Sequence, residues 1–104
     1  MIRTYETVFH AAHYIKNHPK CGTTHGHTYS LKVYVDIEGW IDFHDVKARV
    51  DKVLEKYDHK DLGFATCEDI AENILKALRN VFPRAKWLQV ELKETPEFGV
   101  IVSE

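Results

Sequence analysis

A strict alternation of apolar and polar residues between His27 and Glu38 constrains the fold of this chain more than any other feature. The odd-numbered positions are largely apolar and the even-numbered positions polar: His27, Tyr29, Leu31, Val33, Val35 and Ile37 against Thr28, Ser30, Lys32, Tyr34, Asp36 and Glu38. Because successive side chains of a β-strand point to opposite faces, this pattern predicts a strand with one buried and one exposed face. The chain is therefore expected to build a sheet that is covered on one side.

Two histidines stand at the head of the apolar face of this strand. On a strand, His25 and His27 would share one face about 6.6 Å apart, close enough for both imidazoles to reach one metal ion. A third histidine, His13, lies beyond a short loop that contains Cys21. Three neutral imidazoles with an open fourth position are typical of a catalytic zinc site. The alternatives are a histidine-rich surface turn and a closed structural site in which Cys21 is the fourth ligand.

Three further strands and two helices complete the predicted fold. Strands are expected over 2–13, 87–94 and 98–102, where β-branched and aromatic residues or alternation recur. The helices are indicated by two apolar stripes, Val46, Val50, Val53, Leu54 and Tyr57 after the cap Asp42, and Ile70, Ile74, Leu78 and Val81 after the capping sequence Thr66-Cys67-Glu68-Asp69. The order strand, strand, helix, helix, strand, strand predicts an α+β protein, with a four-stranded antiparallel sheet and both helices on one face.

This order brings the residues with suggestive chemistry to one end of the two layers. His13 ends the first strand and His25 begins the second, while the first helix returns the chain so that Asp58 and His59 reach the same end. Glu94 arrives there at the end of the third strand, on its apolar side. A carboxylate in that position needs a partner if it is buried.

Length and charge limit the classes of function. A chain of 104 residues is expected to form one domain, 1–104, with a modest core that favours oligomerisation. The formal charge of -2, without a basic block, gives no reason to expect nucleic-acid binding. No apolar run approaches the ~20 residues of a membrane span, and the first residues do not resemble a signal peptide, so a cytoplasmic protein without a membrane partner is expected. Cys21 and Cys67 are expected to be free thiols.

The motifs taken together resemble the 6-pyruvoyltetrahydropterin synthase / 6-carboxytetrahydropterin synthase family over nearly the whole chain. The resemblance is carried by Phe9-His10-Ala11-Ala12-His13, Lys20-Cys21 through His25-Gly26-His27, Asp42-Phe43, Asp58-His59 with Leu62, Thr66-Cys67-Glu68-Asp69-Ile70-Ala71, and Lys93-Glu94-Thr95. It implies the tunnelling fold, in which the sheets of three subunits join into a barrel and two trimers stack as a homohexamer. Such an assembly would also protect the edge strands of the sheet.

The resemblance further implies the role of each site residue. In this family's pattern His13, His25 and His27 bind zinc, and Cys21 is the base that abstracts a proton, paired with Asp58 and His59 of a neighbouring subunit. Glu94 would anchor the pterin ring, with Glu68 and Thr66 at the same pocket. The implied substrate is 7,8-dihydroneopterin triphosphate. The spacing of three residues between Cys21 and His25 resembles the branch that forms 6-carboxytetrahydropterin, acetaldehyde and triphosphate on the route to 7-deazaguanines such as queuosine.

Other functions compete with this interpretation. Within the family, a 6-pyruvoyltetrahydropterin synthase would retain the three-carbon side chain of the substrate. Outside it, a non-catalytic zinc-stabilised module would use Cys21 to complete the coordination shell. The chain departs from the family pattern at Gly63, Ala65 and Asp69, which bears on the shape of the pterin pocket. A triphosphate also needs cationic contacts, for which Lys16, Lys20 and Lys60 are candidates.

Overall fold

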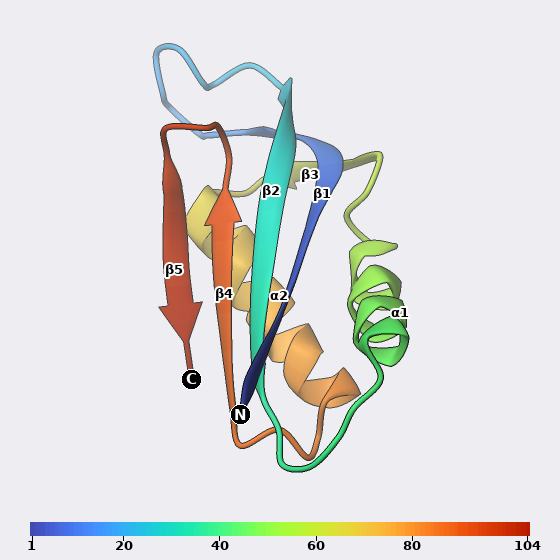
Figure 1. Cartoon of the computed structure of the whole chain (residues 1–104). Coiled ribbons are helices and arrows are strands. Elements are labelled where there is room, and N and C mark those ends of the chain that lie inside the picture. The colour runs from blue at the N-terminus through green and yellow to red at the C-terminus, as the bar shows by residue number, and fades with distance from the viewer.

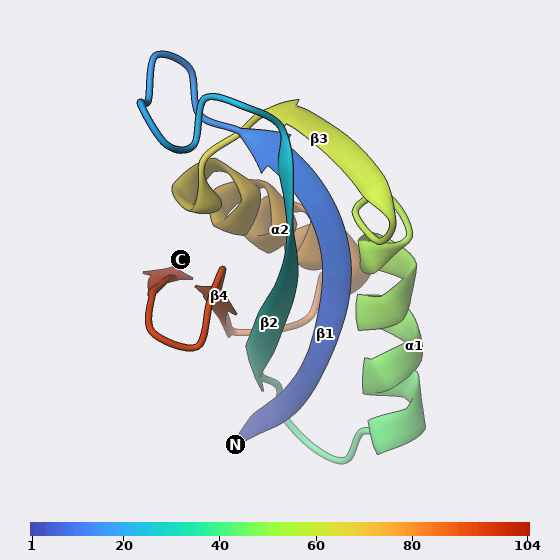
Figure 2. The same cartoon turned by 90° about the horizontal axis from the view of Figure 1, so that it is seen from above.

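The computed structural model describes residues 1–104 as one five-stranded sheet packed against two helices (Figure 1). The elements follow in the order β1 (Ile2–Tyr14), β2 (His25–Asp36), α1 (Phe43–Leu54), β3 (Lys60–Phe64), α2 (Cys67–Val81), β4 (Trp87–Lys93) and β5 (Gly99–Ser103). The strand order in the sheet is β3-β1-β2-β4-β5. Figure 2 shows that β1 and β2 curve strongly along their length, and the long loop between them stands at the end of the sheet where β3 lies. Neither helix is long and apolar enough to cross a bilayer.

The alternation in β2 produces the predicted half-buried sheet. Its odd-numbered residues Tyr29, Leu31, Val33 and Val35 are buried, and they join the buried residues of both helices in one hydrophobic core. The first helix packs on the same face, because the Tyr5 hydroxyl donates a hydrogen bond to Asp51 at 2.9 Å and the Phe9 ring lies 6.1 Å from that of Tyr57. The α+β class, with both helices on one face of the sheet, is thus confirmed.

Both helices begin where their capping residues predict. The Asp42 side chain accepts a hydrogen bond from the backbone N–H of His44 at 2.8 Å, which satisfies a free donor in the first turn of α1. At α2, the Thr66 hydroxyl accepts from the backbone of Asp69 while the Asp69 carboxylate accepts from the backbone of Thr66, both at 3.1 Å. This reciprocal capping box fixes the point at which the chain enters α2, directly beside the ends of β1 and β4.

The prediction of a four-stranded antiparallel sheet is wrong, because it misses one strand. A fifth strand, β3, lies between the helices in sequence and pairs in parallel with β1, with Ala11 opposite Lys60 and Ala12 opposite Asp61. Its sequence Lys-Asp-Leu-Gly-Phe has no alternation, and its residues are exposed or half-buried, so no local pattern predicts it. The strand forms through its tertiary position, since the backbone N–H of His59 donates to the carbonyl of His10 as the chain reaches β1. The element order is therefore ββαβαββ.

Truncating the core under α2 should destabilise the protein without touching the site. Leu78 is fully buried between α2 and the sheet, so we expect Leu78→Ala to lower the free energy of unfolding by about 2–5 kcal/mol. Chemical denaturation in the presence of a chelator measures this change without a metal contribution. Lys76→Ala, exposed on the same helix, is the control and should change the value by less than about 0.5 kcal/mol. Equal stabilities for the two variants would contradict the packing described here.

Candidate metal centre and active site

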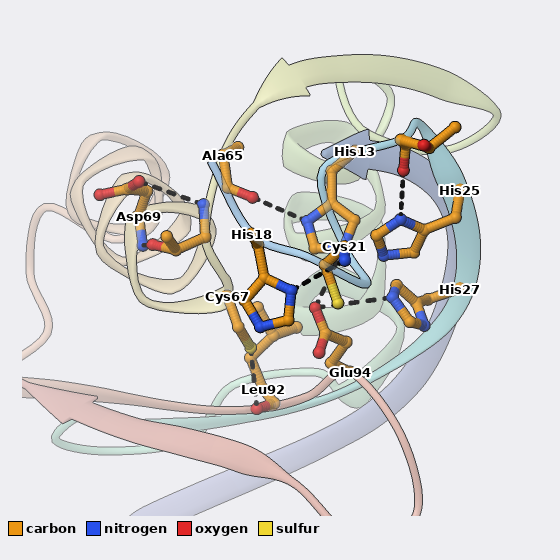
Figure 3. Close-up of polar contacts among 12 residues, drawn as sticks. His13, His18, Cys21, His25, His27, Ala65, Cys67, Asp69, Leu92 and Glu94 are labelled. Carbon is orange, nitrogen blue, oxygen red and sulfur yellow. Dashed lines mark hydrogen bonds and ion pairs between the residues drawn. The ribbon is translucent and has the colours of Figure 1, made fainter. Parts of the chain in front are cut away.

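Three imidazoles meet where the β1–β2 hairpin opens into its loop. The antiparallel register places His13 directly opposite His25, and His27 opposite Ala11, so that all three histidines lie on the helix-covered face. Their candidate ligand nitrogen atoms all lie within 4.8 Å of one another, and the ring centroids are 4.6, 4.8 and 5.0 Å apart (Figure 3). The predicted convergence of His13, His25 and His27 is therefore present in the folded chain.

The hydrogen bonds of these rings suit a metal ion. Nδ1 of His13 lies 2.7 Å from the Ala65 carbonyl, and Nδ1 of His25 lies 2.7 Å from the Thr23 carbonyl. A carbonyl oxygen only accepts, so each Nδ1 carries the proton and each Nε2 keeps its lone pair. The Nε2 atoms of His13 and His27 are buried without a hydrogen-bond partner. A buried imidazole nitrogen without a hydrogen-bond partner is satisfied when it binds a metal ion, and Nε2 of His13 is held ready for this by its tautomer.

Burial favours the neutral form of the third ring. The pKa of His27 is lowered chiefly by desolvation, and the neighbouring His13 and His25 lower it further, whereas Glu94 opposes the shift. A metal ligand must present an unprotonated nitrogen, so this direction of shift favours metal binding over protonation. The three imidazoles can therefore hold a metal ion.

The carboxylate of Glu94 lies against the same imidazoles. Glu94 follows β4, and its Oε1 is 3.1 Å from Nε2 of His13 and 3.6 Å from Nε2 of His27. These contacts lack hydrogen-bond geometry, since both nitrogens have no hydrogen-bond partner. The side chain is 23 % exposed, which agrees with its place on the apolar side of the strand. Since Nε2 of His13 carries no proton, the imidazoles lie beside this carboxylate without donating a hydrogen bond to it.

Cys21 lies in the β1–β2 loop and is half-buried. In Figure 3 its side chain points toward Glu94 and the imidazole cluster. The group of side chains close enough to share one ion consists of the three histidines and does not include the Cys21 thiol. This geometry favours an open site with a neighbouring thiol over a closed shell of three histidines and a cysteine.

Asp58 and His59 contact each other beside His10, which lies on the other face of the sheet. Asp58 Oδ2 lies 3.1 Å from Nδ1 of His59, and Asp58 Oδ1 accepts a hydrogen bond from the backbone N–H of His10 at 3.0 Å. The backbone N–H of His10 is the main reason why the pKa of Asp58 is lowered. The His59 ring lies 5.5 Å from that of His10, whose Nδ1 contacts Thr28 at 3.0 Å.

This placement separates the pair from the metal centre within one chain. His10 and Thr28 occupy even-numbered positions, which face away from the helices, whereas His13 and His27 occupy odd ones. The expectation that these groups reach the same end of the sheet is confirmed, but they lie on opposite faces there. The contact of His10 with Asp58 arises from the pairing of β3 with β1, which the sequence pattern does not reveal.

The start of α2 borders the metal centre mainly as a structural element. The Thr66 hydroxyl is engaged as the helix cap, and Glu68 is exposed. Cys67 is buried, with Sγ 3.7 Å from the Leu92 carbonyl, and burial raises the pKa of its thiol to about 11, aided by the nearby Glu94. The substrate-binding roles expected for Thr66 and Glu68 remain predictions, because the Thr66 hydroxyl is used by the cap and the Glu68 side chain points to solvent.

The two thiols should differ strongly in reactivity. With a pKa of about 11, roughly one Cys67 side chain in three thousand is a thiolate at pH 7.5, and burial further restricts access. We expect iodoacetamide to modify Cys21 first and Cys67 at least about a hundredfold more slowly. Mass spectrometry of tryptic peptides at timed intervals measures both rates. Comparable rates in the native protein would show that Cys67 is not buried as described.

Fold and site together define an α+β protein in which one end of a curved sheet carries a three-histidine metal-binding group beside a free thiol. A family model described as 6-pyruvoyl tetrahydropterin synthase matches residues 3–104. The chain therefore belongs to the 6-pyruvoyl tetrahydropterin synthase family, and the resemblance drawn from its motifs is confirmed.

Individual relatives agree with this family. A provisionally named 6-carboxy-5,6,7,8-tetrahydropterin synthase of Archaeoglobus fulgidus is 38% identical over 89 residues, covering 75% of this chain and 76% of that protein. A dihydroneopterin monophosphate aldolase of Pyrococcus furiosus is 37% identical over 105 residues, covering 92% and 91%. These two relatives are thus a pterin synthase and a pterin aldolase.

Solved structures show the same fold. The 6-pyruvoyl tetrahydropterin synthase of Caenorhabditis elegans superposes with a TM-score of 0.80 at 24% identity, covering 100% of this chain and 96% of that one. The Plasmodium falciparum enzyme superposes with a TM-score of 0.78 at 22% identity, covering 100% and 97%. The chain therefore adopts the tunnelling fold.

Proposed function

We propose that the protein is a zinc-dependent 6-carboxy-5,6,7,8-tetrahydropterin synthase. With one molecule of water, it would convert 7,8-dihydroneopterin triphosphate to 6-carboxytetrahydropterin, acetaldehyde and triphosphate. The observation that carries the proposal is the convergence of His13, His25 and His27, whose ligand nitrogens lie within 4.8 Å of one another and leave room for a fourth ligand. The Archaeoglobus fulgidus relative and the spacing of three residues between Cys21 and His25 support this branch of the family.

Each residue of the centre has a distinct task in this proposal. His13, His25 and His27 hold zinc, which when bound supplies a Lewis acid that polarises oxygen atoms of the substrate side chain. Cys21 takes the proton from the side-chain carbon that this polarisation acidifies. Asp58 orients His59 through their 3.1 Å contact. This pair, supplied by a neighbouring subunit, moves a proton on the side of the substrate opposite Cys21. The separation of Cys21 and His59 on opposite faces within one chain supports a centre shared between subunits.

Glu94 is the proposed anchor of the pterin ring. An ionised carboxylate accepts two hydrogen bonds and matches the adjacent 2-amino and N3 hydrogens of a pterin. Because Oε1 of Glu94 lies 3.1 Å from His13, a ring held by this carboxylate would lie next to the metal ligands. Thr66 and Glu68 would border the ring, and Lys16, Lys20 or Lys60 would contact the triphosphate.

The proposed assembly is a homohexamer made of two trimers, in the cytoplasm. Strands β3 and β5 form the two edges of the sheet, and pairing of edges between subunits would close sheets into a barrel. Light scattering in solution measures the mass directly. A mass of one chain would contradict a centre shared between subunits.

The product decides between the proposed reaction and its rivals. The zinc-loaded protein is incubated with 7,8-dihydroneopterin triphosphate, and acetaldehyde and the pterin products are identified by chromatography and mass spectrometry. Acetaldehyde with 6-carboxytetrahydropterin is the expected result. A 6-pyruvoyl product without acetaldehyde would instead identify a 6-pyruvoyltetrahydropterin synthase, and no turnover of any pterin would leave a non-catalytic zinc module.

A second candidate comes from the Pyrococcus furiosus relative, which matches 92% of this chain. An aldolase would cleave the carbon–carbon bond of dihydroneopterin monophosphate rather than eliminate triphosphate. A parallel incubation with the monophosphate separates the two activities. Turnover of the monophosphate alone would replace the proposed function by the aldolase.

A further inference from the structure

We propose that His18 is a positioning residue that holds the backbone of Cys21 and thereby fixes where its thiol lies. The inference rests on the proposed function, since it assigns His18 to the step in which Cys21 takes a proton. Nδ1 of His18 accepts a hydrogen bond from the backbone nitrogen of Cys21 at 2.8 Å (Figure 3). It accepts a second one from the backbone nitrogen of Lys20 at 3.1 Å.

These two hydrogen bonds define the state of the ring. A nitrogen that accepts from two backbone N–H groups carries no proton, so His18 is neutral with its proton on Nε2. This is the opposite tautomer to that of His13 and His25, whose Nδ1 atoms face carbonyl oxygens. The loop thus uses His18 as an acceptor, whereas the metal centre uses its imidazoles through Nε2.

The remaining hydrogen bonds of the loop hold the carbonyl side of Cys21, whereas its amide is bonded by the His18 ring. The carbonyl of Cys21 accepts from the backbone N–H of Ile15 at 2.7 Å, and the backbone N–H of Gly22 donates to the carbonyl of His18 at 3.0 Å. A Cβ at Gly22 would lie 2.6 Å from that carbonyl oxygen, so only glycine permits the approach. Both sides of Cys21 are therefore tied to the loop, and His18 is the side chain that bonds its amide.

Packing offers Cys21 no comparable support. The residues around it, from Lys16 to Lys20 and from Gly22 to Thr24, are exposed, and none of the loop belongs to the hydrophobic core. Where packing is absent, hydrogen bonds are what fixes the position of a catalytic group on such a loop. Misplacing a proton-abstracting group by about 1 Å can reduce a rate by about a hundredfold, so this acceptor bears directly on turnover.

Three substitutions at position 18 test the role. In His18→Asn the side-chain oxygen takes nearly the place of Nδ1 and restores the acceptor. In His18→Gln the acceptor lies one carbon further out, and His18→Ala has none. We expect kcat to fall by about tenfold to a hundredfold in the alanine and glutamine variants, with a smaller change in KM and full zinc content, whereas asparagine stays within about threefold of the wild type.

Two further measurements do not depend on turnover. Amide NMR should show the Lys20 and Cys21 resonances displaced, with faster hydrogen exchange, in the alanine and glutamine variants but not in asparagine. The rate at which iodoacetamide modifies Cys21 should change in the same variants. Nitrogen NMR of the wild type should show an unprotonated Nδ1 on His18.

The outcomes separate failure of this inference from failure of the proposed function. Unchanged amide resonances in His18→Ala would show that the hydrogen bonds do not hold the loop, and would overturn the inference. Displaced resonances with undiminished kcat would overturn it as well. If the wild type turned over no pterin, the proposed function would fail, and the amide and thiol measurements would still decide whether His18 positions Cys21.

Discussion

Cys21→Ala is expected to keep its metal and to lose turnover by a factor of about a hundred to ten thousand. The three imidazoles form the metal-binding group without the thiol, so the ion should stay when the thiol is removed. The proton on the substrate carbon would then lack its base. Metal content by mass spectrometry and turnover of 7,8-dihydroneopterin triphosphate by chromatography are measured on the same preparation.

Cys67→Ala is the matched control for this substitution. Cys67 is the second free thiol, it is buried in the first turn of α2, and the proposed reaction does not use it. This variant should retain turnover. If Cys21→Ala instead lost its metal and melted at a clearly lower temperature, Cys21 would be the fourth ligand of a structural site.

Removing the metal should abolish turnover and lower stability together. Since the ion binds the folded hairpin and not the unfolded chain, zinc at a thousand times its dissociation constant should raise the free energy of unfolding by about 4 kcal/mol. Chelation should reverse this, and added zinc should restore both activity and stability. Thermal melts with and without chelator, followed by activity assays, measure the two effects.

His25→Ala tests the same site by substitution. His25 is half-buried, so its truncation leaves a smaller defect than truncation of the fully buried His13. We expect this variant to have no measurable turnover and a melting temperature that no longer responds to zinc. Undiminished turnover in the chelated wild type or in His25→Ala would contradict a catalytic metal.

The sequence predicts the metal centre well because its determinants are local. Alternation along β2 places His25 and His27 on the buried face, and the hairpin brings His13 opposite His25. The parity of Glu94 likewise places its carboxylate on the apolar side of the strand, although only the structure shows that it lies beside the imidazoles. The two-residue period of the strands and the order of the elements along the chain are enough to predict these features.

The features that the sequence does not predict depend on contacts between distant segments. β3 has neither alternation nor β-branched residues, and it becomes a strand only because β1 offers its edge. The same pairing brings Asp58 to the backbone of His10. The role proposed for His18 cannot be predicted from the sequence either. The backbone N–H groups of Lys20 and Cys21 meet at its Nδ1 only in the folded loop.

The register of β1 against β2 sets a rule for how this hairpin tolerates insertions. His13 faces His25 across the ladder, and its ring reaches the Ala65 carbonyl beyond β3. One residue added between Phe9 and His13 would reverse the face of one strand segment, and the first imidazole would leave the centre. Residues added between Lys16 and Lys20 would leave the three imidazoles in place but would disturb the hydrogen bonds between His18 and the backbone of Cys21. A change in loop length should therefore affect turnover before metal binding, whereas a change in the parity of β1 should remove a metal ligand.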